Sequence, residues 1–204
     1  MPLLINQIFC KLDPNNLKEK HQMQNTALIL IDIQNDYFEG GALELANADQ
    51  AAKNASLLLK IYRTKQLPII HIQHETLTPE MGFMLPGTRG QKIHSSVAPN
   101  EGETCLTKHY PNAFWNTVLE EMLKEQNITH VVIAGMMTHM CVSTTVRAAM
   151  ERGFQVTAIQ DACATKSLSL NNEEIPADVV HQTALAELTL IAKISLLDQF
   201  IRNL

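Results

Sequence analysis

The sequence predicts an α/β fold: a three-layer α/β/α arrangement around a mainly parallel, Rossmann-like sheet of roughly six strands. Short apolar runs alternate along the chain with segments whose apolar residues recur at helical spacing. The first run, 27–31, is apolar without alternation, which is typical of a parallel strand covered on both faces. Strands that alternate with amphipathic helices indicate right-handed crossovers and a parallel sheet.

The elements follow in order along the chain. We expect strands at 27–31, 69–72, 106–107, 130–134, 154–159 and 192–194, and helices at 47–66, 112–126, 138–152, 175–190 and 196–202. Pro68 follows the first helix and Gly153 ends the third. Residues 1–25 lack clear periodicity and are expected to form an N-terminal arm before a domain at 26–204. The segment 75–103 holds three prolines and four glycines, which predicts a long loop.

Composition narrows the class of protein. The 204 residues are 46% apolar and 18% charged, as in a globular domain with a sizeable core. Sixteen basic and 21 acidic residues give a net charge of −5, which disfavours a nucleic-acid partner, and the apolar runs are too short to span a membrane. The four cysteines form no C-x-x-C pair, and no secretory signal is evident, so we expect a reducing, cytoplasmic location.

Three reactive side chains follow predicted strands. Asp32 comes after the first strand, Lys108 after the short third strand, and Cys141 in the first turn of the helix after the fourth. Singly, each has an ordinary alternative: a helix cap, a solvated surface charge or a small buried thiol. Because ligands of open α/β sheets bind at the carboxyl ends of the strands, the three together predict one site.

The three residue types fit acyl transfer to sulfur followed by hydrolysis. A thiol at a helix N-terminus and near an ammonium group can have a pKa of about 3.5–7.5. Asp32 is expected to take the thiol proton and later give it to a leaving amine, while Lys108 keeps the carboxylate ionised and oriented. Backbone N–H groups before the helix can form an oxyanion hole.

Three segments resemble the signature blocks of the isochorismatase-like cysteine hydrolases: 30–38 (LIDIQNDYF), 108–114 (KHYPNAF) and 133–142 (IAGMMTHMCV). The resemblance covers about Thr26 to Ile194. It implies an Asp32–Lys108–Cys141 triad and a cis peptide bond at Met136–Met137 that aims the Met137 N–H, with that of Cys141, at the oxyanion. It also implies a small-molecule substrate and a homo-oligomer, a dimer or tetramer.

Further residues beside the triad are candidates for binding substrate. They are Gln34, Phe38, His74, Phe114, Trp115 and His139. The two aromatic residues of the expected helix at 112–126 are equally suited to the core, since that helix must bury one face. His139 lies two residues before Cys141, a spacing that does not make the two side chains face each other on a helix.

No metal or cofactor is expected. Nicotinamidases of the family have an Asp-x-His metal motif after the second strand, where this chain has His71-Ile-Gln-His74. Two histidines three apart on a strand point to opposite faces and do not easily share an ion. The departure argues against nicotinamide as the substrate.

Three functions remain open at this point. The first is a cysteine hydrolase that cleaves a small amide or carbamoyl C–N bond. The second keeps the fold but cleaves a vinyl ether, as isochorismatases do, and does not need the thiol. The third is a non-catalytic binding module, in which Cys141 would show no unusual reactivity.

Overall fold

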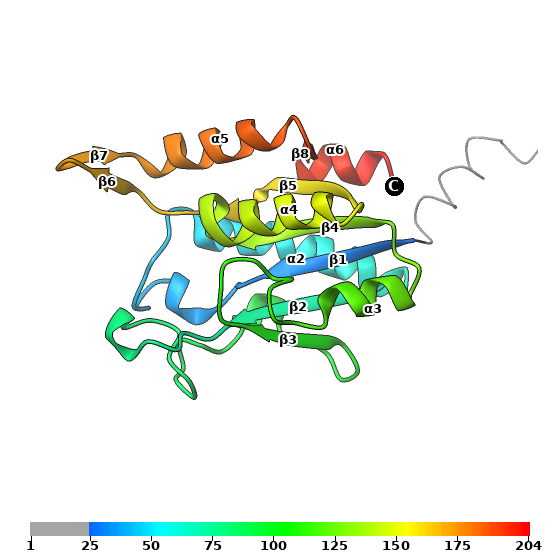
Figure 1. The fold of residues 1–204 in the computed structure, drawn as a ribbon, viewed down its shortest axis with the longest axis horizontal. Helices are drawn as coiled ribbons and strands as arrows, with labels where there is room; N and C mark the ends of the chain where they lie inside the picture. Colours follow the sequence, from blue (N-terminus) through cyan, green and yellow to red (C-terminus); the bar gives the residue numbers. More distant parts are fainter. Residues whose placement is uncertain (1–24) are drawn as a thin grey trace, which may run out of the picture.

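The computed structural model describes residues 25–204, which build a parallel sheet with helices on both faces (Figure 1). The six strands are β1 (Thr26–Ile31), β2 (Ile69–His74), β3 (Thr104–Lys108), β4 (His130–Met136), β5 (Gln155–Ala164) and β8 (Lys193–Ser195). They are ordered β3-β2-β1-β4-β5-β8 and every pairing between them is parallel. The predicted fold class is confirmed, while the predicted arm at 1–25 lies outside the described residues except for Asn25.

Helices cover the two faces of the sheet and enclose two apolar cores. The helices are α2 (Ala48–Thr64), α3 (Leu119–Glu125), α4 (Ser143–Glu151), α5 (Ala177–Leu188) and α6 (Leu197–Arg202). One core holds residues of α3, α4 and α5, and the other holds residues of α2 and α6. In Figure 1, α3 and α4 lie in front of the sheet and α2 behind it. No helix of the described residues is both long and apolar enough to cross a membrane.

The helix expected at 112–126 begins only at Leu119. Asn112 Oδ1 accepts the Phe114 N–H, as a helix cap does, but Asn116 has a left-handed φ of 54° that a right-handed helix does not allow. The left-handed Asn116 thus separates the turn after Pro111 from the helix that starts at Leu119. As a result Trp115 is exposed, although helical spacing placed it on the buried face.

The segment 138–152 is helical, as expected, but it starts with an irregular turn. Thr138–Val142 form a π-helical turn that leads into α4, and the Val142 N–H donates to the Met137 carbonyl. Single π-helical turns occur often at functional sites. Here the wider turn carries Cys141.

A β-hairpin after β5 was missed by the sequence analysis. Strands β6 (Leu168–Leu170) and β7 (Glu173–Ile175) pair antiparallel and project beyond the sheet (Figure 1). Asn171 and Asn172 form the two-residue turn with φ of 53° and 65°. The Asn-Asn pair was the available signal, because two-residue hairpin turns favour residues that tolerate positive φ.

The long loop predicted at 75–103 is confirmed, and the segment after β1 anchors it. The loop contains two short 3-10 helices, Pro79–Met81 and Ser95–Val97. The buried Asp36 carboxylate accepts the Met84 N–H at 2.5 Å and the Ala42 N–H at 3.2 Å. A Cβ at Gly90 would overlap the Asp36 carboxylate, so this contact requires glycine. The loop is thereby held beside the carboxyl ends of β1 and β2.

Candidate active site

Asp32 lies directly after β1 and is completely buried. Its N–H donates to the Ile72 carbonyl at 2.9 Å, and its φ of 52° turns the chain out of the strand. A non-glycine residue at positive φ costs about 1 kcal/mol or more, which the surrounding structure must offset. The neighbouring strand end also requires glycine, because a Cβ at Gly135 would overlap the Ile31 carbonyl. The close approach of β1 and β4 here brings Asp32 near the turn that carries Cys141.

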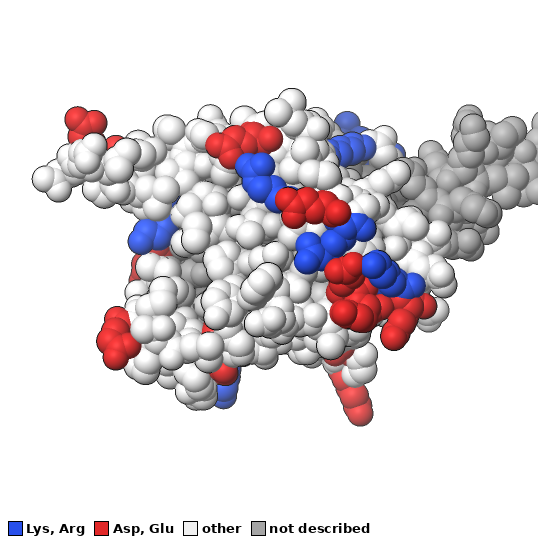
Figure 2. All heavy atoms as spheres, in the orientation of Figure 1, with Lys and Arg blue, Asp and Glu red and all other residues white. Residues whose placement is uncertain are grey.

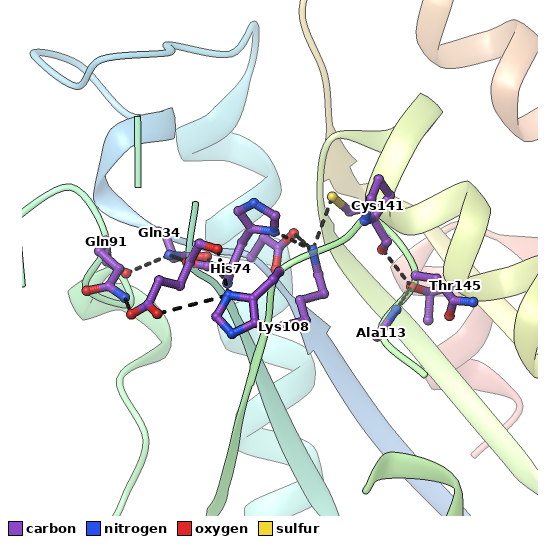
Figure 3. A network of polar contacts seen from close by, with 12 residues as sticks. Gln34, His74, Gln91, Lys108, Ala113, Cys141 and Thr145 are labelled. Carbon is purple, nitrogen blue, oxygen red and sulfur yellow. Dashed lines mark hydrogen bonds and ion pairs between the residues drawn. The ribbon is translucent and has the colours of Figure 1, made fainter. Parts of the chain in front are cut away.

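Lys108 ends β3 and reaches the same point from two strands away. Its ammonium nitrogen lies 2.7 Å from Asp32 Oδ2 and 3.3 Å from Cys141 Sγ (Figure 3). It also donates to Nδ1 of His74, at 3.1 Å. Strand β2 lies between β3 and β1, so the long lysine side chain spans its end. The structure therefore brings together the three side chains that the sequence singled out.

The pKa of the Cys141 thiol differs from the one that the sequence predicts. Burial raises the pKa of Cys141 well above its usual range, and the Asp32 charge raises it further, while Lys108 lowers it less. The expectation of a lowered pKa is therefore wrong for the protein without substrate. The cause is desolvation, because Cys141 is only 7% exposed and a buried thiolate loses its hydration. The resting thiol therefore keeps its proton.

Of the two basic side chains at the site, Lys108 is charged and His74 is neutral. Burial opposes a charge on Lys108, but Asp32 and Cys141 hold its pKa above the ordinary value. Burial and the Lys108 charge lower the pKa of His74 to about 4. His74 is therefore neutral at pH 7, and because lysine only donates, its Nδ1 is the acceptor and Nε2 carries the hydrogen.

Gln34 supports the site without lining it. Its side-chain nitrogen donates to the carbonyls of His74 and Gln91, and its side-chain oxygen accepts the His74 N–H (Figure 3). Its amide group thus holds the end of β2 to the loop that contains Gln91. Gln34 was predicted to bind substrate, but its side chain makes these hydrogen bonds to other residues of the protein.

A pocket of about 250 Å³ opens above Cys141. Its wall comes from the η1 turn (Asn35–Tyr37), the loop after β2, the loop after β3 and the π-helical turn. The lining residues are Tyr37, His74, Thr76, Leu77, Thr78, Met81, Phe83, His109, Tyr110, Pro111, Met137, Met140 and Cys141. His74 is thus the expected substrate-binding residue that faces this space.

Four other expected substrate-binding residues do not line this pocket. Phe38 stacks on the His94 ring with centroids 3.7 Å apart, and His139 hydrogen-bonds Thr165 at 2.6 Å. Phe114 is buried in the core against Phe154, and Trp115 is exposed.

Tyr37 lines the pocket although it was not predicted to bind substrate. It lies next to the expected Phe38, and the 3-10 turn of η1 decides which of the two rings faces Cys141. The adjacent aromatic residues were the signal, but sequence periodicity in a three-residue turn cannot orient them. Phe83 and Met140 were missed for the same reason, since both come from irregular segments.

The expected cis peptide bond at Met136–Met137 is not present, since no cis bond occurs within residues 25–204. Met137 instead turns the chain from β4 into the π-helical turn with a left-handed φ of 60° and ψ of 64°. Its carbonyl accepts the N–H groups of Met140 and Val142. The cis bond was expected to aim the Met137 N–H at the oxyanion, and a left-handed residue without a cis bond stands there instead.

The two histidines of β2 have different hydrogen-bond partners. His71 is buried and donates from Nε2 to Glu103 at 2.9 Å, whereas His74 accepts from Lys108. Arg63 forms two hydrogen bonds with the same Glu103 carboxylate. Among the described residues, no group of three or more His, Cys, Asp or Glu side chains is placed to hold a metal ion.

Replacing Glu103 by Gln is expected to destabilise the fold by about 1–3 kcal/mol at pH 7. Hydrogen bonds from Arg63 foremost, with Asn100 N–H and His71, lower the pKa of Glu103 to about 2. A lowered folded-state pKa adds stability above pH 4.5 that is lost between about pH 4.5 and 2. Urea unfolding at several pH values checks this: the wild-type loss of stability in that window should be smaller in Glu103→Gln. An unchanged pH profile would contradict it.

Comparison with known proteins supports one family. The isochorismatase domain model matches residues 26–195. The chain is 45% identical to the uncharacterized isochorismatase family protein YddQ of Bacillus subtilis, over 80% of this chain and 91% of that one. It is 37% identical to the secreted isochorismatase effector Isc1 of Verticillium dahliae, over 71% and 75% of the two chains.

A solved structure of an isochorismatase-type hydrolase from Oleispira antarctica superposes with a TM-score of 0.84 at 40% identity, and covers 88% of this chain and 97% of that one. Relatives named for a reaction are more distant: streptothricin hydrolase of Streptomyces noursei is 29% identical over 68% of this chain and 54% of that one. Nicotinamidase of Escherichia coli is 27% identical over 69% and 84%. The fold, these matches and the residues at the strand ends show that the chain belongs to the isochorismatase family of hydrolases.

Proposed function

We propose that the protein is a cysteine hydrolase that cleaves an amide or carbamoyl C–N bond of a small molecule through a thioester on Cys141. The observation that carries the proposal is the position of Lys108 Nζ, 2.7 Å from Asp32 and 3.3 Å from the thiol of Cys141, which lines the pocket. A base, a cation and a nucleophile within hydrogen-bonding reach are the parts that acyl transfer needs.

The acylation step begins with Asp32 as the base. Its carboxylate takes the Cys141 proton as the sulfur attacks the substrate carbonyl carbon, so a stable thiolate is not required beforehand. The negative charge moves to the carbonyl oxygen, for which the N–H groups of Met137 and Cys141 are the proposed donors. Asp32 then gives its proton to the leaving nitrogen as the C–N bond breaks and the thioester forms.

Hydrolysis of the thioester reuses the same groups. Asp32 takes a proton from a water molecule whose oxygen attacks the thioester carbon, and the acid product leaves as Cys141 recovers a proton. Lys108 stays charged throughout and orients the carboxylate between the thiol and the pocket. His74 remains neutral, and its Nε2–H is the proposed donor to bound substrate.

Mass spectrometry of a trapped acyl-enzyme tests the proposal. The purified protein is mixed with a panel of small amides and quenched in acid within the first turnovers. We expect an added acyl mass on the peptide that contains Cys141, in the wild type and equally in Cys105→Ala, which removes an exposed thiol outside the site. Turnover of an amide without any adduct, or an adduct on a different residue, would contradict the thioester.

Chelators are expected to leave amide hydrolysis unchanged, because the proposed mechanism uses no metal and His71 and His74 have separate protein partners. Initial rates measured after dialysis against EDTA check this prediction. A loss of activity that added zinc or manganese restores would contradict it and assign a metal to the site.

We also propose a homo-oligomer in a reducing, cytoplasmic compartment. Exposed Leu168 and Leu170 on the projecting hairpin support a contact between copies, since apolar side chains on a hairpin gain from being covered. Cys105, Cys141 and Cys163 are free thiols, as in a reducing compartment. Light scattering of the purified chain and fractionation of the source cells test the two statements.

A further inference from the structure

The pocket beside Cys141 is largely apolar. Its apolar lining residues include Leu77, Met81, Phe83, Met137 and Met140. No Lys, Arg, Asp or Glu is among the lining residues that the structure describes. On the face shown in Figure 2, charged side chains form a band over α5, α4 and α3, while the surface over the loop between β3 and α3 is mostly uncharged.

The charges nearest the pocket are not available to a ligand. Lys108 is 1% exposed and already contacts Asp32, Cys141 and His74. His74 is neutral at pH 7, since burial foremost lowers its pKa to about 4. His109 also lines the pocket, but its Nδ1 already contacts the Glu75 carbonyl at 2.9 Å and lies 4.0 Å from the Glu75 carboxylate. A substrate carboxylate in this space would therefore lose its hydration without gaining an unpaired cation, which is unfavourable.

Tyr37 supplies a polar group to this apolar wall. The residue is 2% exposed and lines the pocket, where its charge neighbours include Cys141 and Asp32. Its hydroxyl makes no hydrogen bond with another described residue, and protein atoms do not enclose it completely. The hydroxyl therefore reaches the open space of the pocket, and burial with the nearby negative charges keeps its pKa raised and its proton bound.

We infer that the substrate is an uncharged amide with an apolar group, and that the Tyr37 hydroxyl is a specificity-determining donor to a neutral oxygen or nitrogen acceptor beside the scissile amide. The apolar group would lie against Phe83 and the methionines of the pocket. The inference rests on the proposed function, because it assigns the substrate class of that site.

Three matched probes test the charge preference: benzamide, 3-methoxybenzamide and 3-carboxybenzamide. We expect kcat/KM for both uncharged probes to exceed that for the carboxylate by about 100-fold or more, since an unpaired buried charge costs several kcal/mol. Equal or faster hydrolysis of the carboxylate, with an acyl adduct on Cys141, would overturn this inference and leave the proposed function standing. If neither these probes nor a wider amide panel yields turnover or a Cys141 adduct, the proposed function itself fails.

Tyr37→Phe tests the hydroxyl, with Tyr62→Phe as the matched control. Tyr62 is also buried with an unpartnered hydroxyl, but it belongs to α2 and does not line the pocket. For 3-methoxybenzamide, Tyr37→Phe should raise KM about 2–12-fold with kcat little changed, as expected for one lost hydrogen bond. KM for benzamide and both constants of Tyr62→Phe should not change. An unchanged KM in Tyr37→Phe, or the same increase for benzamide, would overturn the role of the hydroxyl.

Discussion

Cys141→Ala is expected to lower amide hydrolysis by about 10⁴–10⁶-fold, because loss of the nucleophile removes the covalent route and leaves only binding and oxyanion stabilisation. The substitution should not unfold the protein. The side chain is small and 7% exposed, so only one sulfur atom is lost from the core. Initial rates with the best amide substrate, together with circular dichroism, measure the two expectations.

Two controls make this result specific. Cys105→Ala removes an exposed thiol and should keep wild-type rates. A vinyl-ether substrate provides the second control, because its hydrolysis does not need a sulfur nucleophile. Loss of amide cleavage in Cys141→Ala supports the thioester. Retained amide cleavage in this variant would show that Cys141 is not the nucleophile. Retained ether cleavage in the same variant would favour the isochorismatase-type reaction.

Asp32→Asn is expected to slow acylation by about 10³-fold or more, because asparagine cannot accept the thiol proton or return it to the leaving nitrogen. The same substitution should make the thiol easier to deprotonate. The Asp32 charge is, after burial, the main cause of the raised pKa of Cys141, and Lys108, which lowers that pKa, would remain. Alkylation of Cys141 by iodoacetamide should therefore be faster in the variant at pH 8.

The opposite signs of these two effects separate a base from a merely structural residue. A damaged site would lose hydrolysis without gaining alkylation, and would also lose the cooperative thermal transition. Single-turnover rates and alkylation rates are measured on the same preparation. Near-normal turnover in Asp32→Asn would remove Asp32 as the proton acceptor, and slower alkylation would contradict its effect on the thiol.

The order of elements and the residues at the strand ends could be predicted from the sequence. Apolar runs and helical spacing are local properties, and parallel strands place their carboxyl ends at one edge. That is why Asp32, Lys108 and Cys141 could be assigned to one place before any coordinates. The missed hairpin at β6–β7 and the late start of α3 are local exceptions, in which asparagines with left-handed φ outweigh apolar spacing.

The tertiary structure decided what surrounds those three residues. Whether Tyr37 or Phe38 faces the pocket depends on a three-residue turn, and Phe83 reaches it from a loop anchored by Asp36. The acidity of Cys141 depends on how much water its neighbours exclude, which no sequence pattern states. The sequence by itself determined which side chains stand at the strand ends, because apolar runs are local and parallel strands share one carboxyl edge. Which of those strands are neighbours was decided by the tertiary structure. The protonation of those side chains and the shape of the pocket follow from packing between distant segments.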